Sequence, residues 1–275
     1  MIEQSVVHKY LRKNKKFPHI WCPGCGHGVI MGSLLRAIDK MGVDRNNVAV
    51  ISGIGCSSRT PTYLDFNTLH TTHGRALAFA TGVKLARPDM LVIVVMGDGD
   101  AVGIGGNHFI HAARRNMDLK VVVYNNNIYG MTGGQASPTT PSGKKATTAR
   151  YGNIERSFDI CDLARSTGAN YVARATSYHV KQLENYIYKS FNKKGFTVVE
   201  AVTHCPTTYG RLNSLKEPVA GMEFQKNNFI MKNLWDKLSD EEKQVKFPMG
   251  EFVDVDKEGF VTKYLNLIES VRQGD

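Results

Sequence analysis

LVIVVMGDGD, residues 91–100, joins an uninterrupted apolar run to a Gly-Asp-Gly turn. Such a run of branched apolar residues predicts a strand over residues 91–96 that is buried on both faces, as strands of parallel sheets are. The glycines on either side of Asp98 let the backbone approach a phosphate closely, and a helix expected over residues 104–115 adds partial positive charge. Asp98 offers a carboxylate oxygen, which Mg²⁺ prefers as a ligand. The stretch therefore predicts a strand–turn–helix unit with a candidate phosphate and metal site.

A run of asparagines, YNNN at residues 124–127, ends the next expected strand. Residues 100–125 separate Gly99 from Asn126, a length that suits a strand–helix–strand unit returning the chain to the same edge of a parallel sheet. Asp98 and Asn126 can therefore share one ion. A simple turn and a simple loop would explain the two motifs separately, but their spacing and placement favour a metal–diphosphate site.

Strand-like and helical patterns alternate along the first 200 residues, which is typical of a doubly wound, mostly parallel α/β sheet. Strands are expected at residues 48–52, 91–96, 119–124, 171–175 and 196–201, and helices at residues 28–41, 75–87, 104–115, 160–167 and 180–192. Residues 130–152 are rich in Gly, Thr, Ser and Pro and predict a long loop beside the site. The strand pattern fades from Pro206. We therefore expect one domain over residues 1–210 and a C-terminal arm over residues 211–275 that packs on a partner subunit.

Composition limits the possible function. The net charge of +10 favours anionic partners, but no basic motif interleaved with aromatic residues indicates nucleic acid. No apolar run approaches the ~18 residues that span a membrane, and no charged-then-apolar leader opens the sequence. Five cysteines, an odd number, fit a reducing compartment. We expect a cytoplasmic protein that binds neither nucleic acid nor a membrane.

Four cysteines are expected at the same sheet edge as the Gly-Asp-Gly turn. Cys22 and Cys25 form a CxxC pair in WCPGCG, while Cys56 and Cys205 each follow a predicted strand. Cysteine thiolates are ligands for iron–sulfur clusters and for zinc. The residues alone leave an iron–sulfur cluster, a zinc site, a redox dithiol and incidental thiols as alternatives. Cys161 lies in an apolar helical pattern and is expected in the core.

Longer strings around these motifs resemble the β subunits of 2-oxoacid:ferredoxin oxidoreductases. The Gly-Asp-Gly…Asn-Asn pattern is similar to the thiamine diphosphate signature, which implies a diphosphate-binding domain of that type. The resemblance runs from about His19 to Arg211 and includes several unrelated strings in consistent order. These are WCPGCG (residues 21–26), GCSSR (55–59), HGRA (73–76), GGNH (105–108) and YGMTGGQ (129–135).

The resemblance implies three cofactors and the residues that bind them. A [4Fe-4S] cluster would be held by Cys22, Cys25, Cys56 and Cys205. Mg²⁺ would be held by Asp98, Asn126 and the backbone carbonyl of Ile128. Thiamine diphosphate would contact Ile54, Gly55, Cys56, Ser57, His73, Gly99, Asp100, Gly130 and Met131. The residues expected nearest the reaction are Arg59, His73 and Met131.

The resemblance also implies a reaction and its partners. The expected activity is CoA-dependent oxidative decarboxylation of a 2-oxoacid to an acyl-CoA and CO₂, with electrons passing through the cluster to ferredoxin. Only the diphosphate-binding half of a thiamine site is visible, so an α subunit should supply the aminopyrimidine- and CoA-binding domains in an αβ or (αβ)₂ assembly. Arg59 could bind the distal carboxylate of 2-oxoglutarate, which favours that substrate over pyruvate. Alternatives are a non-oxidative decarboxylase or carboligase component with structural zinc, and a non-catalytic electron-transfer or nucleotide-binding module.

A run of basic residues precedes Cys22. It comprises Lys9, Arg12, Lys13, Lys15 and Lys16. A run of this kind is usually a solvated face. The alternative is a docking patch for an acidic ferredoxin, whose association would then weaken with salt.

Overall fold

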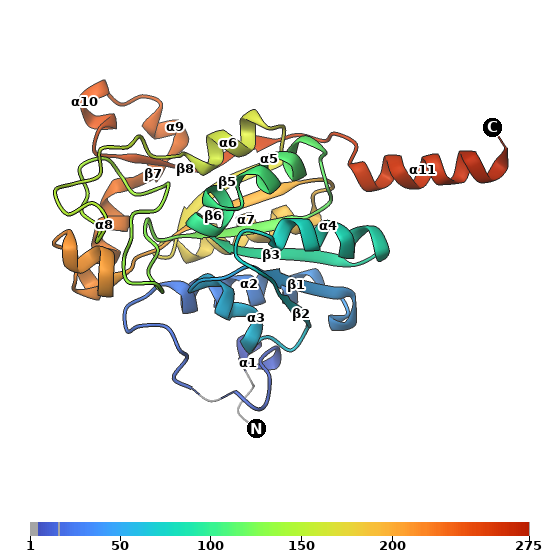
Figure 1. Ribbon diagram of the computed structural model, residues 1–275, viewed down its shortest axis with the longest axis horizontal. Coiled ribbons are helices and arrows are strands. Elements are labelled where there is room, and N and C mark those ends of the chain that lie inside the picture. Colours follow the sequence, from blue (N-terminus) through green and yellow to red (C-terminus); the bar gives the residue numbers. More distant parts are fainter. Residues whose placement is uncertain (1–4, 16, 275) are drawn as a thin grey trace.

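The computed structural model describes residues 5–15 and 17–274, and its centre is an eight-stranded sheet (Figure 1). The strands follow the order β2-β1-β3-β4-β6-β5-β8-β7. Neighbouring strands are parallel except β5 and β8, which are antiparallel. The strands are β1 (Val48–Ser52), β2 (Asn67–His70), β3 (Leu91–Gly97), β4 (Lys120–Asn125), β5 (Tyr171–Thr176), β6 (Thr197–Val202), β7 (Phe229–Met231) and β8 (Phe247–Asp254).

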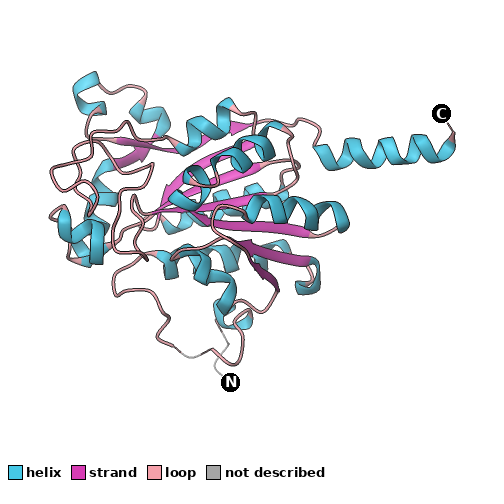
Figure 2. Ribbon diagram, in the orientation of Figure 1, coloured by secondary structure: helices cyan, strands magenta, loops and turns pink. Residues whose placement is uncertain are grey.

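Helices cover both faces of this sheet (Figure 2). The helices of the described residues are α1 (Val6–Lys9), α2 (His27–Met41), α3 (Thr60–Tyr63), α4 (Ala76–Ala86), α5 (Gly106–Arg114), α6 (Ile160–Ser166), α7 (Val180–Asn192), α8 (Pro218–Asn228), α9 (Lys232–Trp235), α10 (Asp240–Lys243) and α11 (Phe260–Gln273). The doubly wound, mostly parallel α/β fold predicted from the sequence is confirmed. The five predicted strands agree with β1, β3, β4, β5 and β6 to within one residue at each end.

Each face of the sheet has its own hydrophobic core. In β1, Val48 and Val50 pack in the core that contains α2 and α7, whereas Ala49 and Ile51 pack in the core that contains α4 and α5. Successive residues of a strand point to opposite faces, so burial of both faces requires the unbroken apolar runs seen in the sequence. Each isoleucine or leucine buried in these cores contributes ~1.5–3 kcal/mol to folding.

Helix α2 follows from its apolar spacing and its C-terminal glycine. Ile30, Leu34 and Ile38 recur at helical intervals, and all three are buried against the sheet. Gly42 ends the helix with a φ of 63°, a left-handed conformation that glycine adopts without strain. The helix therefore begins directly after the CxxC loop and anchors that loop to the core.

The C-terminal region differs from the sequence expectation. The strand pattern was expected to fade after Pro206, yet β8 pairs antiparallel with β5, and β7 extends the sheet beyond it. The apolar alternation of β8 is interrupted by Pro248 and by Gly250, whose φ is 132°, and these residues hide the strand in the sequence. Residues 222–238 have helical character in the sequence, but in the structure β7 divides them between α8 and α9.

Helix α11 projects away from the rest of the fold (Figure 1). Val261 is its buried residue, while Leu267 and Val271 are exposed. The boundary at residue 210 and the packing of residues 211–275 on a partner stay predictions. No helix within residues 5–15 and 17–274 is long and apolar enough to cross a membrane.

Candidate functional site

The carboxyl ends of four adjacent strands converge at one edge of the sheet. Strands β3 and β4 are paired in parallel with Gly97 opposite Tyr124, so Asp98 and Asn126 follow at the same edge. Strand β1 lies beside β3 and leads to Cys56, and β6 lies beside β4 and leads to Cys205. The structure therefore brings together one cysteine from each side and the two candidate metal ligands between them.

A cavity of about 160 Å³ opens at this edge. Its walls come from the loops that follow β1, β3 and β4, and Asp98, Asn126 and Ile128 are among its lining residues. The other lining residues include every predicted thiamine contact, namely Ile54, Gly55, Cys56, Ser57, His73, Gly99, Asp100, Gly130 and Met131. Arg59, Cys22, Cys25 and Cys205 do not line it.

The Asp98 carboxylate is oriented by hydroxyl donors from the long loop after β4. Ser137 Oγ and Thr139 Oγ1 each donate to Asp98 Oδ2 over 2.6 Å, and no described side chain donates to Oδ1. Burial raises the pKa of Asp98 above its usual value. A cation at Oδ1 would favour the ionised carboxylate, so this arrangement suits a metal ligand.

Asp100 joins three segments around the cavity. Its Oδ1 accepts hydrogen bonds from Gly74 N (2.6 Å) and Ile54 N (3.3 Å), and it lies 2.8 Å from His73 Nδ1. The hydrogen bond with Asp100 raises the pKa of His73. A Cβ atom at Gly53 would lie 2.3 Å from Asp100 Oδ1, so this close approach requires glycine. Asp100 fixes the imidazole of His73 at the cavity wall.

The cysteines lie beside this cavity, and Cys56 is the one that lines it. A Cβ atom added at Gly130 would lie 3.6 Å from Cys205 Sγ, 3.8 Å from Cys56 Sγ and 3.7 Å from Asn126 Nδ2. Burial raises the pKa of Cys25 to about 12 and that of Cys56 to about 11, and repulsion from the other thiolates of the group adds to both increases. The four thiols therefore form one electrostatic group beside a candidate metal ligand.

The spacing of these thiols discriminates between a single ion and a cluster. Among the described residues, only Asp159, Cys161 and Glu200 bring three metal-binding atoms within 4.8 Å of one another. Tetrahedral zinc with Zn–S bonds of about 2.3 Å would hold its sulfur atoms only ~3.8 Å apart. No three of the thiols of Cys22, Cys25, Cys56 and Cys205 lie within 4.8 Å of one another, so they are more widely spaced here than the ligands of one zinc ion.

Cys161 belongs to a different environment. It is buried, and its Sγ lies 3.3 Å from Glu200 Oε2. Arg174 already supplies the positive charge here, because it pairs with both Asp159 and Glu200 over 2.7 Å. Asp159 and Glu200 are therefore the ion-pair partners of Arg174 rather than ligands of a metal, and Cys161 lies in the core as expected.

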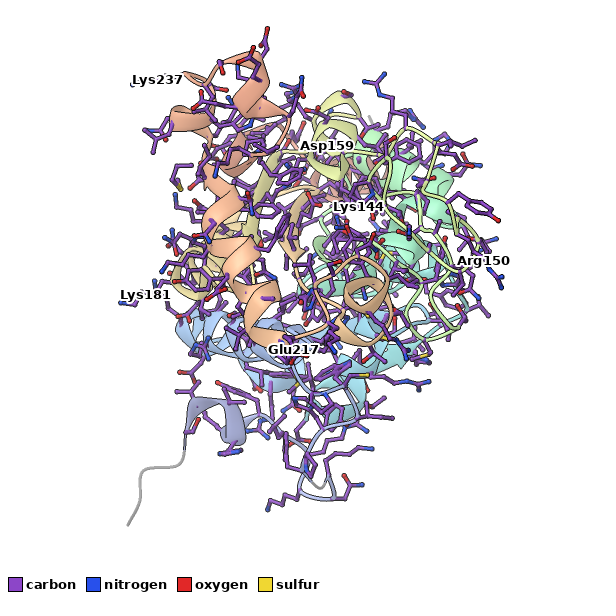
Figure 3. The ribbon with its side chains drawn as sticks, turned by 90° about the vertical axis from the view of Figure 1, so that its left-hand side faces the viewer. Lys144, Arg150, Asp159, Lys181, Glu217 and Lys237 are labelled. Carbon is purple, nitrogen blue, oxygen red and sulfur yellow. The ribbon has the colours of Figure 1, made fainter. Side chains whose placement is uncertain are left out.

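A buried polar network connects this ion pair to Asp98, and sequence analysis missed it. Glu200 Oε1 accepts a hydrogen bond from Asn125 Nδ2 over 2.7 Å, and Asn125 Oδ1 lies 3.1 Å from Thr139 Oγ1, which binds Asp98. Asn125, Asp159, Arg174 and Glu200 line a second cavity of about 310 Å³, and Asp159 is labelled in Figure 3. A glutamate within the apolar strand TVVEAV was the available signal in the sequence.

Arg59 lies at the margin of the first cavity. Its Nη2 is 3.8 Å from Met131 Sδ, and Met131 is a half-exposed lining residue. The Nε atom of Arg59 is buried without a hydrogen-bond partner among the described residues. An unpaired guanidinium donor beside the cavity could bind an anionic group of a ligand.

Comparison with known proteins connects this geometry to a family. Residues 53–201 match the family model described as "Thiamine pyrophosphate enzyme, C-terminal TPP binding domain". The chain is 52% identical over 264 residues to "2-oxoglutarate synthase subunit KorB" of Methanocaldococcus jannaschii, covering 96% of this chain and 97% of that protein. It is 59% identical over 198 residues to the protein of the same name from Archaeoglobus fulgidus, covering 72% of this chain and 73% of that protein.

A solved structure extends the similarity to the whole fold. It is described as "2-oxoglutarate:ferredoxin oxidoreductase from Magnetococcus marinus with 2-oxoglutarate, coenzyme A and succinyl-CoA bound". The TM-score is 0.84 at 32% identity, and the match covers 96% of this chain and 90% of that chain. The similarity therefore includes the region after residue 211 as well as the cofactor-binding core.

The buried network yields a prediction about stability. Arg174→Met leaves Glu200 as a buried charge without a counter-ion, so we expect the free energy of unfolding to fall by ~3–5 kcal/mol. The double variant R174M/E200Q removes both charges and keeps an acceptor for Asn125, so it should be more stable than the single variant. Urea denaturation of the purified chain measures both values.

The exposed pair of Arg165 and Asp162, 2.9 Å apart, provides the control. Arg165→Met should change the free energy of unfolding by no more than ~1 kcal/mol, because water screens this pair. If Arg174→Met is as mild as Arg165→Met, the buried network does not contribute as described.

Proposed function

The chain belongs to the β subunits of the 2-oxoacid:ferredoxin oxidoreductase family, and we propose that it forms half of an active site for CoA-dependent oxidative decarboxylation. The substrate would be a 2-oxoacid, with 2-oxoglutarate favoured over pyruvate, and the products an acyl-CoA and CO₂. The electrons would pass through a [4Fe-4S] cluster to ferredoxin. The names of the relatives, which include 2-oxoglutarate synthase and a complex with 2-oxoglutarate and coenzyme A, support this substrate.

One observation carries the proposal. Gly130 lies between the cysteine group and Asn126, since a single added carbon there would contact Cys56, Cys205 and Asn126 together. A redox group and a metal–diphosphate site are thereby brought within a few atoms of each other. A non-oxidative decarboxylase has no need of that proximity, whereas an oxidoreductase requires it.

Asp98, Asn126 and the carbonyl of Ile128 would hold Mg²⁺, and the cavity they line would hold thiamine diphosphate. The available groups fit an anionic ligand, because Ser57 Oγ is buried without a partner among the described residues and His73 has a raised pKa. When bound, thiamine diphosphate supplies the nucleophilic carbon and electron sink for decarboxylation. The chain's own residues orient the diphosphate, neutralise it through the metal and keep the site buried.

Asp98→Ala should abolish turnover and weaken thiamine diphosphate binding, because the metal that neutralises the diphosphate loses its carboxylate ligand. Asn126→Ala should have the same effect in milder form, since it removes a neutral ligand. Calorimetric titration of thiamine diphosphate in the presence of Mg²⁺ measures the loss of affinity. Visible absorbance should be unchanged in both variants, which would show that the cysteine group is intact.

Asp162→Ala, an exposed carboxylate on α6, is the matched control and should bind thiamine diphosphate as the wild type does. Wild-type cofactor affinity in Asp98→Ala would exclude Asp98 as the metal ligand.

Cys22, Cys25, Cys56 and Cys205 would hold the [4Fe-4S] cluster. Such a cluster supplies one-electron acceptance next to the cofactor. The cysteines would contribute soft ligands from three separate segments of the chain. The ring of His27 lies beside them, with Nδ1 2.9 Å from Cys25 Sγ. The spacing of the thiols supports the cluster over the alternative of structural zinc.

Anaerobically purified protein should be brown and should contain iron and sulfide in equal amounts, about four of each per chain. Cys205→Ser should lose the visible absorbance and the iron. Cys161→Ser should keep both, because Cys161 packs against Glu200 and a serine hydroxyl can make the same contact. A colourless wild-type protein with stoichiometric zinc would instead favour the non-oxidative decarboxylase or carboligase.

The partner would be an α subunit that completes the site. We propose that residues 1–210 carry the cofactors and that residues 211–275, whose strands β7 and β8 complete the same sheet, also pack on the partner in an αβ or (αβ)₂ assembly. The exposed apolar residues of α11 support this, because Leu267 and Val271 are uncovered on a helix that projects from the fold (Figure 1). The α subunit would supply the groups that bind the aminopyrimidine ring and CoA.

Arg59 would select the substrate. Its guanidinium adjoins Met131 at the cavity margin and keeps a buried Nε without a partner among the described residues. A distal carboxylate, which 2-oxoglutarate has and pyruvate lacks, would satisfy this donor. A phosphate contact or a structural role is the alternative for Arg59.

Arg59→Gln should lower kcat/KM for 2-oxoglutarate. The loss should correspond to ~1.5–3 kcal/mol of transition-state stabilisation, as expected for loss of a charge-assisted hydrogen bond. The value for pyruvate should change little, because pyruvate offers no group to this side chain. Steady-state kinetics with both substrates measure the two values in parallel. An equal loss for both substrates would assign Arg59 to general cofactor binding or to structure.

A further inference from the structure

Residues 13–15 and 17–22, between α1 and α2, form a segment that presents exposed apolar side chains next to the cysteine group. Phe17 is 49% exposed and Ile20 is 69% exposed, and the chain then reaches Cys22, which is also exposed. In Figure 1 this segment forms the lower end of the molecule, on the side of the N-terminus. Large apolar side chains exposed in one short stretch commonly mark an interaction surface.

Aromatic packing supports this segment from behind. Phe17 contacts Tyr63 and His19 at ring-centroid distances of 6.1 and 6.4 Å, and Tyr63 OH accepts a hydrogen bond from Ile20 N over 2.7 Å. His19 in turn contacts Trp21 at 5.0 Å. The exposed apolar residues are thus held on a packed aromatic layer.

The same aromatic layer adjoins the cysteines. Trp21 Nε1 donates to the backbone carbonyl of Cys56 over 2.7 Å. The Trp21 ring also contacts His27 at 5.8 Å, and His27 Nδ1 lies 2.9 Å from Cys25 Sγ. The exposed surface is therefore separated from two of the candidate cluster ligands by only one layer of rings.

Some of the basic side chains around this surface already have partners and others do not. Lys9 pairs with Asp39 over 2.8 Å, and Arg12 binds Leu64 O and Thr68 Oγ1. Lys13 and Lys15 are exposed and form no ion pair within residues 5–15 and 17–274, while Lys16 lies outside the described residues. The basic run expected from the sequence thus narrows to two cations available to a partner.

We propose that the surface formed by Lys13, Lys15, Phe17, Ile20 and Cys22 is the docking site for a small acidic iron–sulfur electron carrier. Lys13 and Lys15, which have no ion-pair partner among the described residues, would attract acidic residues around the carrier's own redox centre. The same charges disfavour a second copy of this chain, whose net charge is +10. The proposal rests on the cluster proposed above and adds the site at which electrons leave it. In each encounter the carrier gains one electron and the cluster of this chain loses one, with no bond formed or broken and no proton transferred.

Charge reversal in the complete complex with its α subunit tests the docking site. For the variant K13E/K15E we expect kcat/KM with an acidic ferredoxin to fall at least about tenfold at low ionic strength, because attraction becomes repulsion. The salt dependence of ferredoxin reduction should also weaken or reverse. The rate with a neutral nitroimidazole acceptor should be unchanged, since that acceptor needs no docking surface.

Two further variants sharpen the test. K181E/K237E reverses two other exposed lysines without ion pairs among the described residues, and both are labelled on the face shown in Figure 3. This control has the same net charge as K13E/K15E and should keep ferredoxin reduction near the wild-type value. Ile20→Ser should raise the KM for ferredoxin but leave its salt dependence intact, because it removes apolar contact and no charge.

The outcomes separate this proposal from the proposed function. Equal losses with both acceptors, equal losses in K181E/K237E, or no loss in K13E/K15E would overturn the docking site while leaving the enzyme's reaction intact. Loss of the α subunit from the purified K13E/K15E complex would overturn it too, because the segment would then be a subunit interface. A wild-type complex that reduces neither acceptor would overturn the proposed function itself, and this inference with it.

Discussion

The parallel register of β1, β3, β4 and β6 is the constraint on which the site depends. Because these four neighbouring strands run in one direction, their carboxyl ends meet at one edge of the sheet. The two central strands lead to Asp98 and Asn126, and the two flanking strands lead to Cys56 and Cys205. A shift of register between β3 and β4 would separate Asp98 from Asn126. The apolar residues that bury both faces of these strands therefore also fix the positions of the candidate site residues.

The long loop after β4 is held by the site rather than by its own secondary structure. It has no helix or regular strand before α6, yet Ser137 and Thr139 anchor it to Asp98. The network from Thr139 through Asn125 to Glu200 connects the same carboxylate to the interior of β6. A buried glutamate is costly by itself, and Arg174 offsets that cost by pairing with it. The orientation of the candidate metal ligand thus depends on an ion pair beyond the cavity.

Sequence reasoning located elements whose signal is local. The strand 91–96 with its Gly-Asp-Gly turn was visible because apolar run, glycines and helix lie consecutively, and the Asn run was visible through its spacing. Strand β2 was missed because its residues, Asn67–His70, are mostly exposed edge residues without an apolar run. The Glu200–Arg174 pair and the Ser137 contact were not predictable, because they join residues that are distant in sequence and become neighbours only through the sheet.

Gly130 lies where the cysteine group meets the cavity. Its backbone lies where thiols of Cys56 and Cys205 approach the amide of Asn126, and any side chain there would contact all three. An added Cβ would make only ordinary van der Waals contacts there, so the backbone path at this point, rather than the absence of a side chain, brings the cysteine group close to the cavity. Across the same group, Trp21 and His27 provide one aromatic layer toward the exposed surface at Phe17 and Ile20. The chain therefore arranges cavity, cysteine group and exposed surface in sequence, an order that suits the electron path proposed above.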